Sequence, residues 1–182
     1  MKTTDRALLL AEIAGKHPNT GKTAIMKFAY LLQTLYDVPF GYEFEIYTYG
    51  PFSQTVMSDL EFAEFSDYID IKPIQYDSYS GYCIDETSDG KECAAKNHEF
   101  LDCYESQILK VLDFFGNKNA KQLELYSTVV FVAKSTLLET KKIDKVSICR
   151  TVQEIKPHFS AEVISQAFVD LERGEMLSKL SA

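Results

Sequence analysis

Apolar residues recur at three- and four-residue intervals along most of this chain, which is the pattern of amphipathic helices. In one such segment, Ile25, Phe28 and Leu32 fall on a single helical face. The spacing predicts helices at about residues 4–16, 23–37, 51–65, 97–116, 119–139, 144–155 and 161–173. The segment at 119–139 is apolar nearly all round, so we expect it to form the buried centre of the fold.

Residues 42–47 alternate between aromatic or apolar residues and polar ones, which predicts a half-buried strand. Gly50 and Pro51 end that strand, and proline suits the first turn of the next helix, where its missing N–H costs nothing. We call residues 47–53 the tyrosine corner. Its candidate binding residues are Tyr47, Tyr49, Gly50, Pro51, Phe52 and Ser53. The corner is either a packing corner with a serine cap or an edge that binds a partner, because tyrosine-rich surface is favoured at interfaces.

Two further strands, at residues 68–77 and 81–85, predict a β-hairpin joined by the sequence SYSG, and residues 86–92 predict a loop. The order helix, helix, helix, hairpin is that of a winged-helix domain, with one extra strand before the third helix. We therefore expect a mainly helical α+β fold. A winged-helix-like part with a small antiparallel sheet, at residues 1–95, packs on a helical part at 96–182, which ends in a helix-turn-helix-like pair. We expect the two parts to form one compact unit.

The sequence GKHPNTGKT, at residues 15–23, looks like the phosphate-binding loop of nucleotide hydrolases. However, Gly15 lies one residue too far from the Gly-Lys-Thr sequence, and a helix precedes the segment where the motif requires a buried strand. We interpret Gly15 as the end of the first helix and Thr20 or Thr23 as the cap of the second. An anion held at that helix start by Lys22 and Thr23 is the alternative.

Charge is distributed unevenly around the net value of −8. Residues 37–105 carry −13, whereas the flanking residues 1–36 and 116–156 carry +3 and +4. An acidic middle repels a polyanion, so nucleic-acid binding is disfavoured and would have to come from the basic flanks.

The N-terminal segment places Asp5, Arg6 and Glu12 in or beside its apolar residues, which is unlike a signal peptide. No apolar stretch approaches the roughly 20 residues of a membrane helix. We therefore expect a cytosolic protein without membrane association, whose four cysteines are free thiols.

Residues of types that bind metals or perform catalysis gather between Cys83 and Cys103. The spacing of Cys83, Cys93, His98 and Cys103 matches no paired zinc-binding sequence, so we predict no metal ion. His98 and Asp102 are four residues apart on one helix face, a spacing that far more often gives a surface hydrogen bond than a catalytic pair. With no other catalytic motif or cofactor-binding loop, we predict no cofactor and no enzymatic activity. A small-molecule or metal-dependent enzyme is the weaker alternative.

Three stretches of this chain together resemble the YwgA-like proteins of bacteria and archaea. They are GKTAIMKFAYLLQ, YTYGPFSQTVMSDLEF, and LELYSTVVFV with VQEIKPHFSAEVISQAFVDLERGEML, and the resemblance spans roughly residues 5–178. In such proteins Gly-Lys-Thr opens the second helix and does not hold phosphate, and the family implies no established activity. More distantly, the helix, YGP, helix pattern resembles the Panacea (SocA-type) antitoxin domain, which implies a mainly helical domain that binds a protein such as a toxin or a protease.

The sequence therefore predicts a non-enzymatic, antitoxin- or adaptor-like module that binds another protein through the tyrosine corner. The alternative is a winged-helix regulator that binds DNA. Against it, the helix after YGP carries Asp59, Glu61 and Glu64 without a basic residue, whereas a helix that reads DNA presents arginine, lysine, asparagine or glutamine.

Overall fold

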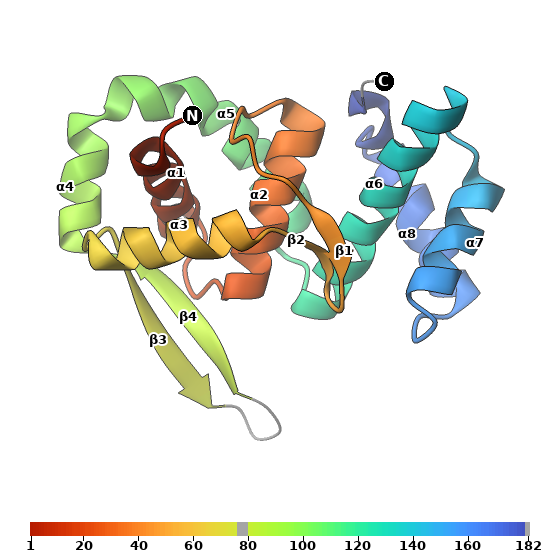
Figure 1. Cartoon of the computed structure of the whole chain (residues 1–182), viewed down its shortest axis with the longest axis horizontal. Coiled ribbons are helices and arrows are strands. Elements are labelled where there is room, and N and C mark those ends of the chain that lie inside the picture. The colour runs from red at the N-terminus through yellow and green to blue at the C-terminus, as the bar shows by residue number, and fades with distance from the viewer. Residues whose placement is uncertain (76–79, 181–182) are drawn as a thin grey trace.

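Helix α2 runs through the middle of the fold, with α1 and α3 on one side and α6 on the other (Figure 1). The computed structural model describes residues 1–75 and 80–180. The elements in chain order are α1 (Thr3–Lys16), α2 (Lys22–Tyr36), β1 (Glu45–Tyr47), β2 (Gly50–Phe52), α3 (Gln54–Phe65), β3 (Ile69–Gln75), β4 (Ser80–Glu86), α4 (Ser88–Lys96), α5 (His98–Phe115), α6 (Ala120–Thr140), α7 (Lys145–Ile155), α8 (Ala161–Arg173) and the short 3-10 helix η1 (Leu177–Lys179). The fold is thus mainly helical α+β, as predicted.

The helices predicted from apolar spacing are confirmed, with ends close to the expected positions. In α3, Val56, Leu60 and Ala63 recur at helical spacing and are all buried. Helix α8 begins where Ser160 accepts a hydrogen bond from the Val163 amide at 3.4 Å. Among the helices in the described part of the chain, none is long and apolar enough to cross a membrane.

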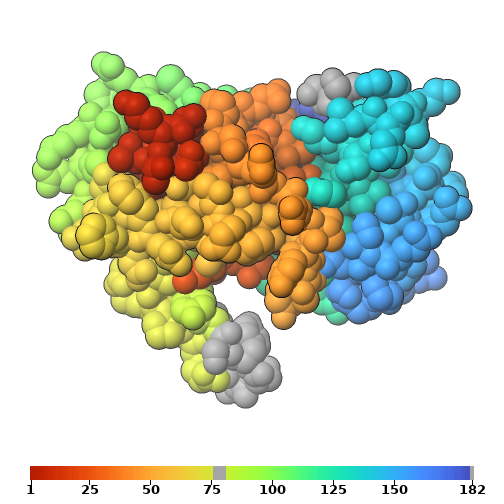
Figure 2. Space-filling view, viewed as in Figure 1, coloured from red at the N-terminus to blue at the C-terminus, as the bar shows by residue number. Residues whose placement is uncertain are grey.

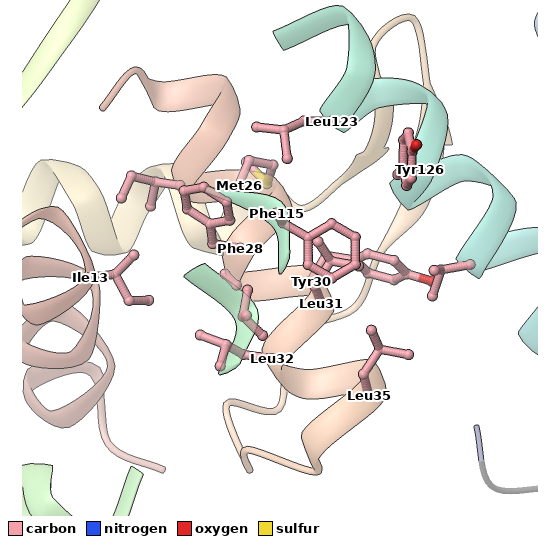
Figure 3. Packing of buried hydrophobic residues seen from close by; sticks show 14 of the residues in the cluster. Ile13, Met26, Phe28, Tyr30, Leu31, Leu32, Leu35, Phe115, Leu123 and Tyr126 are labelled. Carbon is pink, nitrogen blue, oxygen red and sulfur yellow. The ribbon is translucent and has the colours of Figure 1, made fainter. Parts of the chain in front are cut away.

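The core is built on α2 and α6, each of which buries ten residues. Beside Phe28 of α2 lie Ile13 from α1 and Phe115 from α5, and Leu123 and Tyr126 of α6 extend the same cluster (Figure 3). One cluster of buried apolar side chains continues from α1 to η1 and includes the faces of α7 and α8 that pack on α6. Both predicted parts of the chain therefore contribute to a common core. The boundary near residue 95 and the likeness to a winged helix stay predictions.

The strand predicted at 42–47 is shorter than expected, although its alternation is confirmed. Tyr42 is buried and Glu43 exposed, while regular pairing begins only at β1. The expectation for Gly50 and Pro51 was wrong: they belong to β2, which pairs antiparallel with β1 through Tyr47 opposite Gly50. A two-residue turn therefore reverses the chain before α3 begins. Ser53 occupies the N-cap position of α3, but its side chain caps no amide within the described residues.

The predicted hairpin is confirmed as β3 and β4, in register from Ile69 opposite Glu86 to Gln75 opposite Ser80. Two of the four predicted linking residues, 78 and 79, lie outside the described residues. The hairpin projects from the body of the molecule (Figure 1), and its base is tied to the chain before α2 by the Ile84 amide, which donates to the Thr20 carbonyl at 2.7 Å.

The loop predicted at 86–92 is wrong, because α4 begins at Ser88. Thr87 caps this helix by accepting a hydrogen bond from the Gly90 amide at 2.9 Å. Gly90 packs so tightly that a Cβ atom there would lie 2.2 Å from the Tyr68 carbonyl oxygen. A residue that suggested a loop in the sequence is thus needed for helix packing.

Candidate interaction site

The sequence GKHPNTGKT joins α1 to α2 without either predicted threonine cap. His17 ends α1, its Nε2 donating to the Gly116 carbonyl at 2.9 Å while its Nδ1 faces the Thr20 hydroxyl. The N-cap of α2 is Gly21, and Thr23 lies inside the helix, so the expectation that a threonine caps α2 was wrong. Thr20 is instead used to hold His17 and, through its backbone, the β3–β4 hairpin.

Lys22, the predicted anion-binding residue, is the first residue of α2. Its ammonium group lies 4.3 Å from the centroid of the Tyr82 ring, a cation–π contact that links α2 to β4. Thr23 follows it, half-buried.

The sulfur- and imidazole-bearing candidates do not form one site. Cys83 is buried on β4 beside Asp85, whereas Cys103 is exposed on α5. His98 contacts the Ala95 carbonyl through Nδ1 at 3.1 Å. Over residues 1–75 and 80–180, no three histidine, cysteine, aspartate or glutamate side chains lie close enough together to hold a metal ion.

The tyrosine corner forms the turn of the β1–β2 hairpin and presents two large side chains to solvent. Tyr47 and Tyr49 are 67% and 66% exposed. Phe52 is half-buried, with its ring centroid 5.7 Å from that of Tyr47. The buried members of the corner are Gly50, Pro51 and Ser53. A partner can therefore reach the tyrosines and part of Phe52, while the buried residues position the turn.

Gly50 allows this turn to lie directly on α6. Its φ angle is +87°, in the region that favours glycine. A Cβ atom there would also lie 3.1 Å from the Thr128 hydroxyl oxygen and 3.2 Å from the Glu124 carbonyl oxygen. Both the backbone conformation and the close approach to α6 explain why glycine stands at this position.

A buried lysine after α7 holds the other side of the turn. Lys156 Nζ donates to the Tyr47 carbonyl at 2.9 Å and to the Thr48 carbonyl. The same ammonium group lies 2.9 Å from Glu124 Oε1, although this pair lacks hydrogen-bond geometry, and His158 Nε2 lies 3.4 Å from that oxygen. The side chains of Lys156 and Glu124 are only 4% and 7% exposed. The charge pair is therefore buried beneath the turn.

A second buried lysine, Lys27 of α2, donates to the Pro51 carbonyl at 2.6 Å. It is 2% exposed, and its burial lowers its pKa to about 8. Attraction to Glu124 partly opposes that shift, and repulsion from Lys156 adds to it. Two ammonium groups from distant helices thus fix three carbonyl groups of the tyrosine corner.

Because the Lys27 ammonium group is buried, we expect the unfolding free energy to depend on pH. Its folded pKa of about 8 lies below the ordinary value of 10.5. Above about pH 8 the folded protein has therefore released a proton that the unfolded chain still holds, and stability rises with pH wherever the unfolded state binds more protons. Between about pH 7 and 9.5, wild type should gain roughly 1–2 kcal/mol of unfolding free energy relative to Lys27→Met. Urea denaturation of both proteins across this range measures it, and a constant difference would contradict it.

A surface hollow of about 650 Å³ lies beside the tyrosine corner. The corner (orange) borders α7 (blue) in Figure 2, and the hollow is formed where these two segments and α6 meet. The lining residues are Ile46, Tyr47, Thr48, Tyr49, Glu124, Ile155, Lys156 and His158. The two exposed tyrosines thus stand at the edge of a concave surface, which is the usual shape of a binding site.

Three residues that build this site were not singled out from the sequence: Lys27, Glu124 and Lys156. Lys27 interrupts the apolar run AIMKFAYLL, and Glu124 interrupts LELYSTVVFV. Because lysine and glutamate are almost never fully buried unless paired, a charge inside an apolar helical run indicates a buried pair. Lys156 lacks such a signal, because it follows α7 in the turn KPHF.

Comparison with known proteins does not assign the chain. No protein-family model matches it, and no curated protein matches it in sequence. The tyrosine corner and the hollow beside it are the features from which a function can be argued.

Proposed function

We propose that this chain is a non-enzymatic interaction module of the cytosol, antitoxin- or adaptor-like, which binds another protein through the tyrosine corner. The observation that carries the proposal is that Tyr47 and Tyr49 are both about two-thirds exposed beside the hollow. Tyrosine is enriched among the residues that contribute most to binding energy, because it offers a large rigid apolar ring together with a polar hydroxyl.

The anchoring of the corner supports this proposal. Lys156 and Lys27 bind the backbone carbonyls of the turn, and Gly50 seats it on α6. The turn is therefore held in one conformation before any partner arrives. Less conformational entropy is lost when a preorganised surface binds, so more of the contact energy is retained as affinity.

Protein binding is better supported than DNA binding by the charges on the two candidate reading helices. On α3, Glu61 and Glu64 are exposed, while Asp59 is buried. On α8, the second helix of the helix-turn-helix-like pair, Glu162 and Glu172 are exposed, together with Arg173 as its one basic residue. Carboxylates on these surfaces repel the phosphates of DNA. A salt-sensitive gel shift on a defined DNA sequence would instead favour the DNA-binding alternative.

Alanine at both tyrosines should weaken partner capture without unfolding the protein. Loss of two interface tyrosines removes on the order of 2 kcal/mol of binding energy, or about 30-fold in affinity. The unfolding free energy should change by less than about 0.5 kcal/mol, because both side chains are mainly exposed. Cross-linking in the native host followed by quantitative mass spectrometry, with the partner then purified for titration, measures both effects.

Phe65→Ala is the matched control for this experiment, because Phe65 is an exposed aromatic residue, 87% accessible, at the end of α3. It should leave capture unchanged. The proposal is wrong if wild type captures no specific partner, or if the Tyr47→Ala/Tyr49→Ala protein captures it as well as wild type does.

A further inference from the structure

We propose that the hollow beside the tyrosine corner receives an arginine side chain of the partner protein, with its guanidinium group against the ring of Tyr47 or Tyr49. The inference rests on the proposed function for the existence of a partner, and it adds the chemistry of the contact. Arginine is the cation most often found over aromatic rings, since its planar guanidinium stacks on the ring and is weakly hydrated.

The first observation concerns which exposed rings already carry a cation. Among the described residues, the exposed tyrosines and phenylalanines are Tyr47, Tyr49, Phe65 and Tyr82. The Tyr82 ring is covered by Lys22, and other rings that are buried or half-buried also carry a lysine, as Tyr36 does with Lys179. Among residues 1–75 and 80–180, no arginine or lysine lies over Tyr47 or Tyr49. The Tyr49 ring and the side of the Tyr47 ring that does not pack against Phe52 are thus available to a cation from outside.

Phe65 lacks such a cation within the described residues as well, but its surroundings differ. Phe65 is exposed at the end of α3 and is not among the residues that line the hollow, whereas Tyr47 and Tyr49 both line it. A side chain that enters the hollow would contact a tyrosine ring while it loses part of its contact with water. Cation–π attraction is stronger at such a partly desolvated site than on an open surface.

The second observation is the charge at the rim of the hollow. Glu45 is exposed and lies on the same face of β1 as Tyr47, two residues away. On the opposite side, exposed Glu154 directly precedes Ile155, which lines the hollow. Of these two carboxylates, Glu45 is the one that β1 places beside a tyrosine of the hollow, where it attracts a cation. The segment that contains the tyrosine corner, residues 37–105, carries −13, whereas residues 116–156, which supply most of the other side of the hollow, carry +4.

Two lysines near the hollow are already engaged by other groups of the protein. Lys156 is paired with Glu124 and donates to the Tyr47 carbonyl, and Lys27 donates to the Pro51 carbonyl from beneath the turn. Both lysines are at least 97% buried, so an entering side chain meets the exposed tyrosine rings first. Lys121, on the neighbouring surface, lies over the Phe159 ring. The ammonium groups of these lysines are thus engaged within the protein, which leaves Tyr47 and Tyr49 for an entering cation.

The test is a titration of the full ¹⁵N-labelled chain, observed by NMR, with three blocked pentapeptides that differ at one residue. The central residue is arginine, its neutral isostere citrulline, or glutamate, each flanked by glycines and added at millimolar concentration. The arginine peptide should shift the amide signals of residues 47–50 and 155–158 and bind roughly fivefold more tightly than the citrulline peptide. The glutamate peptide should produce no shift there.

Two variants make the result specific. Tyr47→Phe/Tyr49→Phe keeps both rings and should retain most of the arginine-dependent shift, whereas Tyr47→Ala/Tyr49→Ala should abolish it. Equal binding of the arginine and citrulline peptides, preferential binding of the glutamate peptide, or no shift with any peptide would overturn the inference.

The outcome also separates this inference from the proposed function. If a partner is captured through the tyrosines but the arginine peptide does not bind the hollow, only the arginine contact is wrong. If the arginine peptide binds and no specific partner is captured in cells, the hollow recognises arginine and the interaction-module proposal is wrong.

Discussion

Replacement of Lys156 by methionine should lower the unfolding free energy by about 3–5 kcal/mol, as expected when one partner of a buried ion pair is removed. The methionine fills a similar volume but leaves the Glu124 carboxylate buried without its cation. It also removes the hydrogen bonds to the carbonyls of Tyr47 and Thr48. The change acts on the tyrosine corner directly, so partner capture should fall with it. Urea denaturation measures the stability, and partner titration under native conditions measures the binding.

Two further variants test the physical reason for this loss. The first is Lys142→Met, at an exposed lysine two residues after the end of α6. It should change the unfolding free energy by less than about 0.5 kcal/mol. The double variant Lys156→Met/Glu124→Met removes both charges and should be more stable than Lys156→Met alone, because an apolar pair of similar volume avoids the desolvation penalty. If Lys156→Met unfolds at the same urea concentration as Lys142→Met, the buried pair does not hold the corner.

The helices were predictable because their signal lies within each segment. The apolar run of α6 marks it as buried, and the structure buries ten of its residues. Ser160 before α8 could likewise be identified as a cap from its position alone. Such features depend on residues three or four apart, which is the range over which a sequence pattern specifies local structure.

The β1–β2 turn could not be predicted in the same way. The sequence Gly50-Pro51 indicates that a strand ends, but it does not indicate whether a helix or a second, antiparallel strand follows. The outcome is decided by α6, where the Thr128 hydroxyl and the Glu124 carbonyl approach the position that a Cβ atom of Gly50 would fill. These residues lie more than seventy positions further along the chain, so no local pattern contains the contact.

The candidate site combines the two kinds of information. Tyr47 and Tyr49 were identified because aromatic residues are dense in one short stretch, and the structure exposes both. The residues that hold them were missed, because the pairing of Lys156 with Glu124 joins the end of α7 to the start of α6. The exposed tyrosines could therefore be predicted from a short stretch of sequence. The buried residues that hold the turn could not, because their contacts depend on tertiary packing.

A second ion pair, between Arg6 and Asp59, should contribute as much to the unfolding free energy as the pair of Lys156 and Glu124. Replacement of Asp59 by alanine should cost about 3–5 kcal/mol of unfolding free energy. Asp59 is 2% exposed on α3 and accepts hydrogen bonds from Arg6 Nε at 2.6 Å, Arg6 Nη2 at 3.2 Å and the Tyr42 hydroxyl at 2.8 Å. Its removal leaves a partly buried guanidinium without a counter-charge and a buried hydroxyl without an acceptor. Chemical denaturation of the purified protein gives the measurement.

Glu61→Ala is the matched control, since Glu61 is an exposed carboxylate two residues further along the same helix, and its loss should change stability by less than about 0.5 kcal/mol. Asp59→Asn should fall between the two, because its amide oxygen can still accept from Tyr42 while the charge opposite Arg6 is lost. Equal stabilities of Asp59→Ala and Glu61→Ala would contradict this ranking. A large loss would instead show that Asp59, which the sequence places among the acidic residues of a candidate reading helix, joins α3 to α1 and the segment that precedes β1.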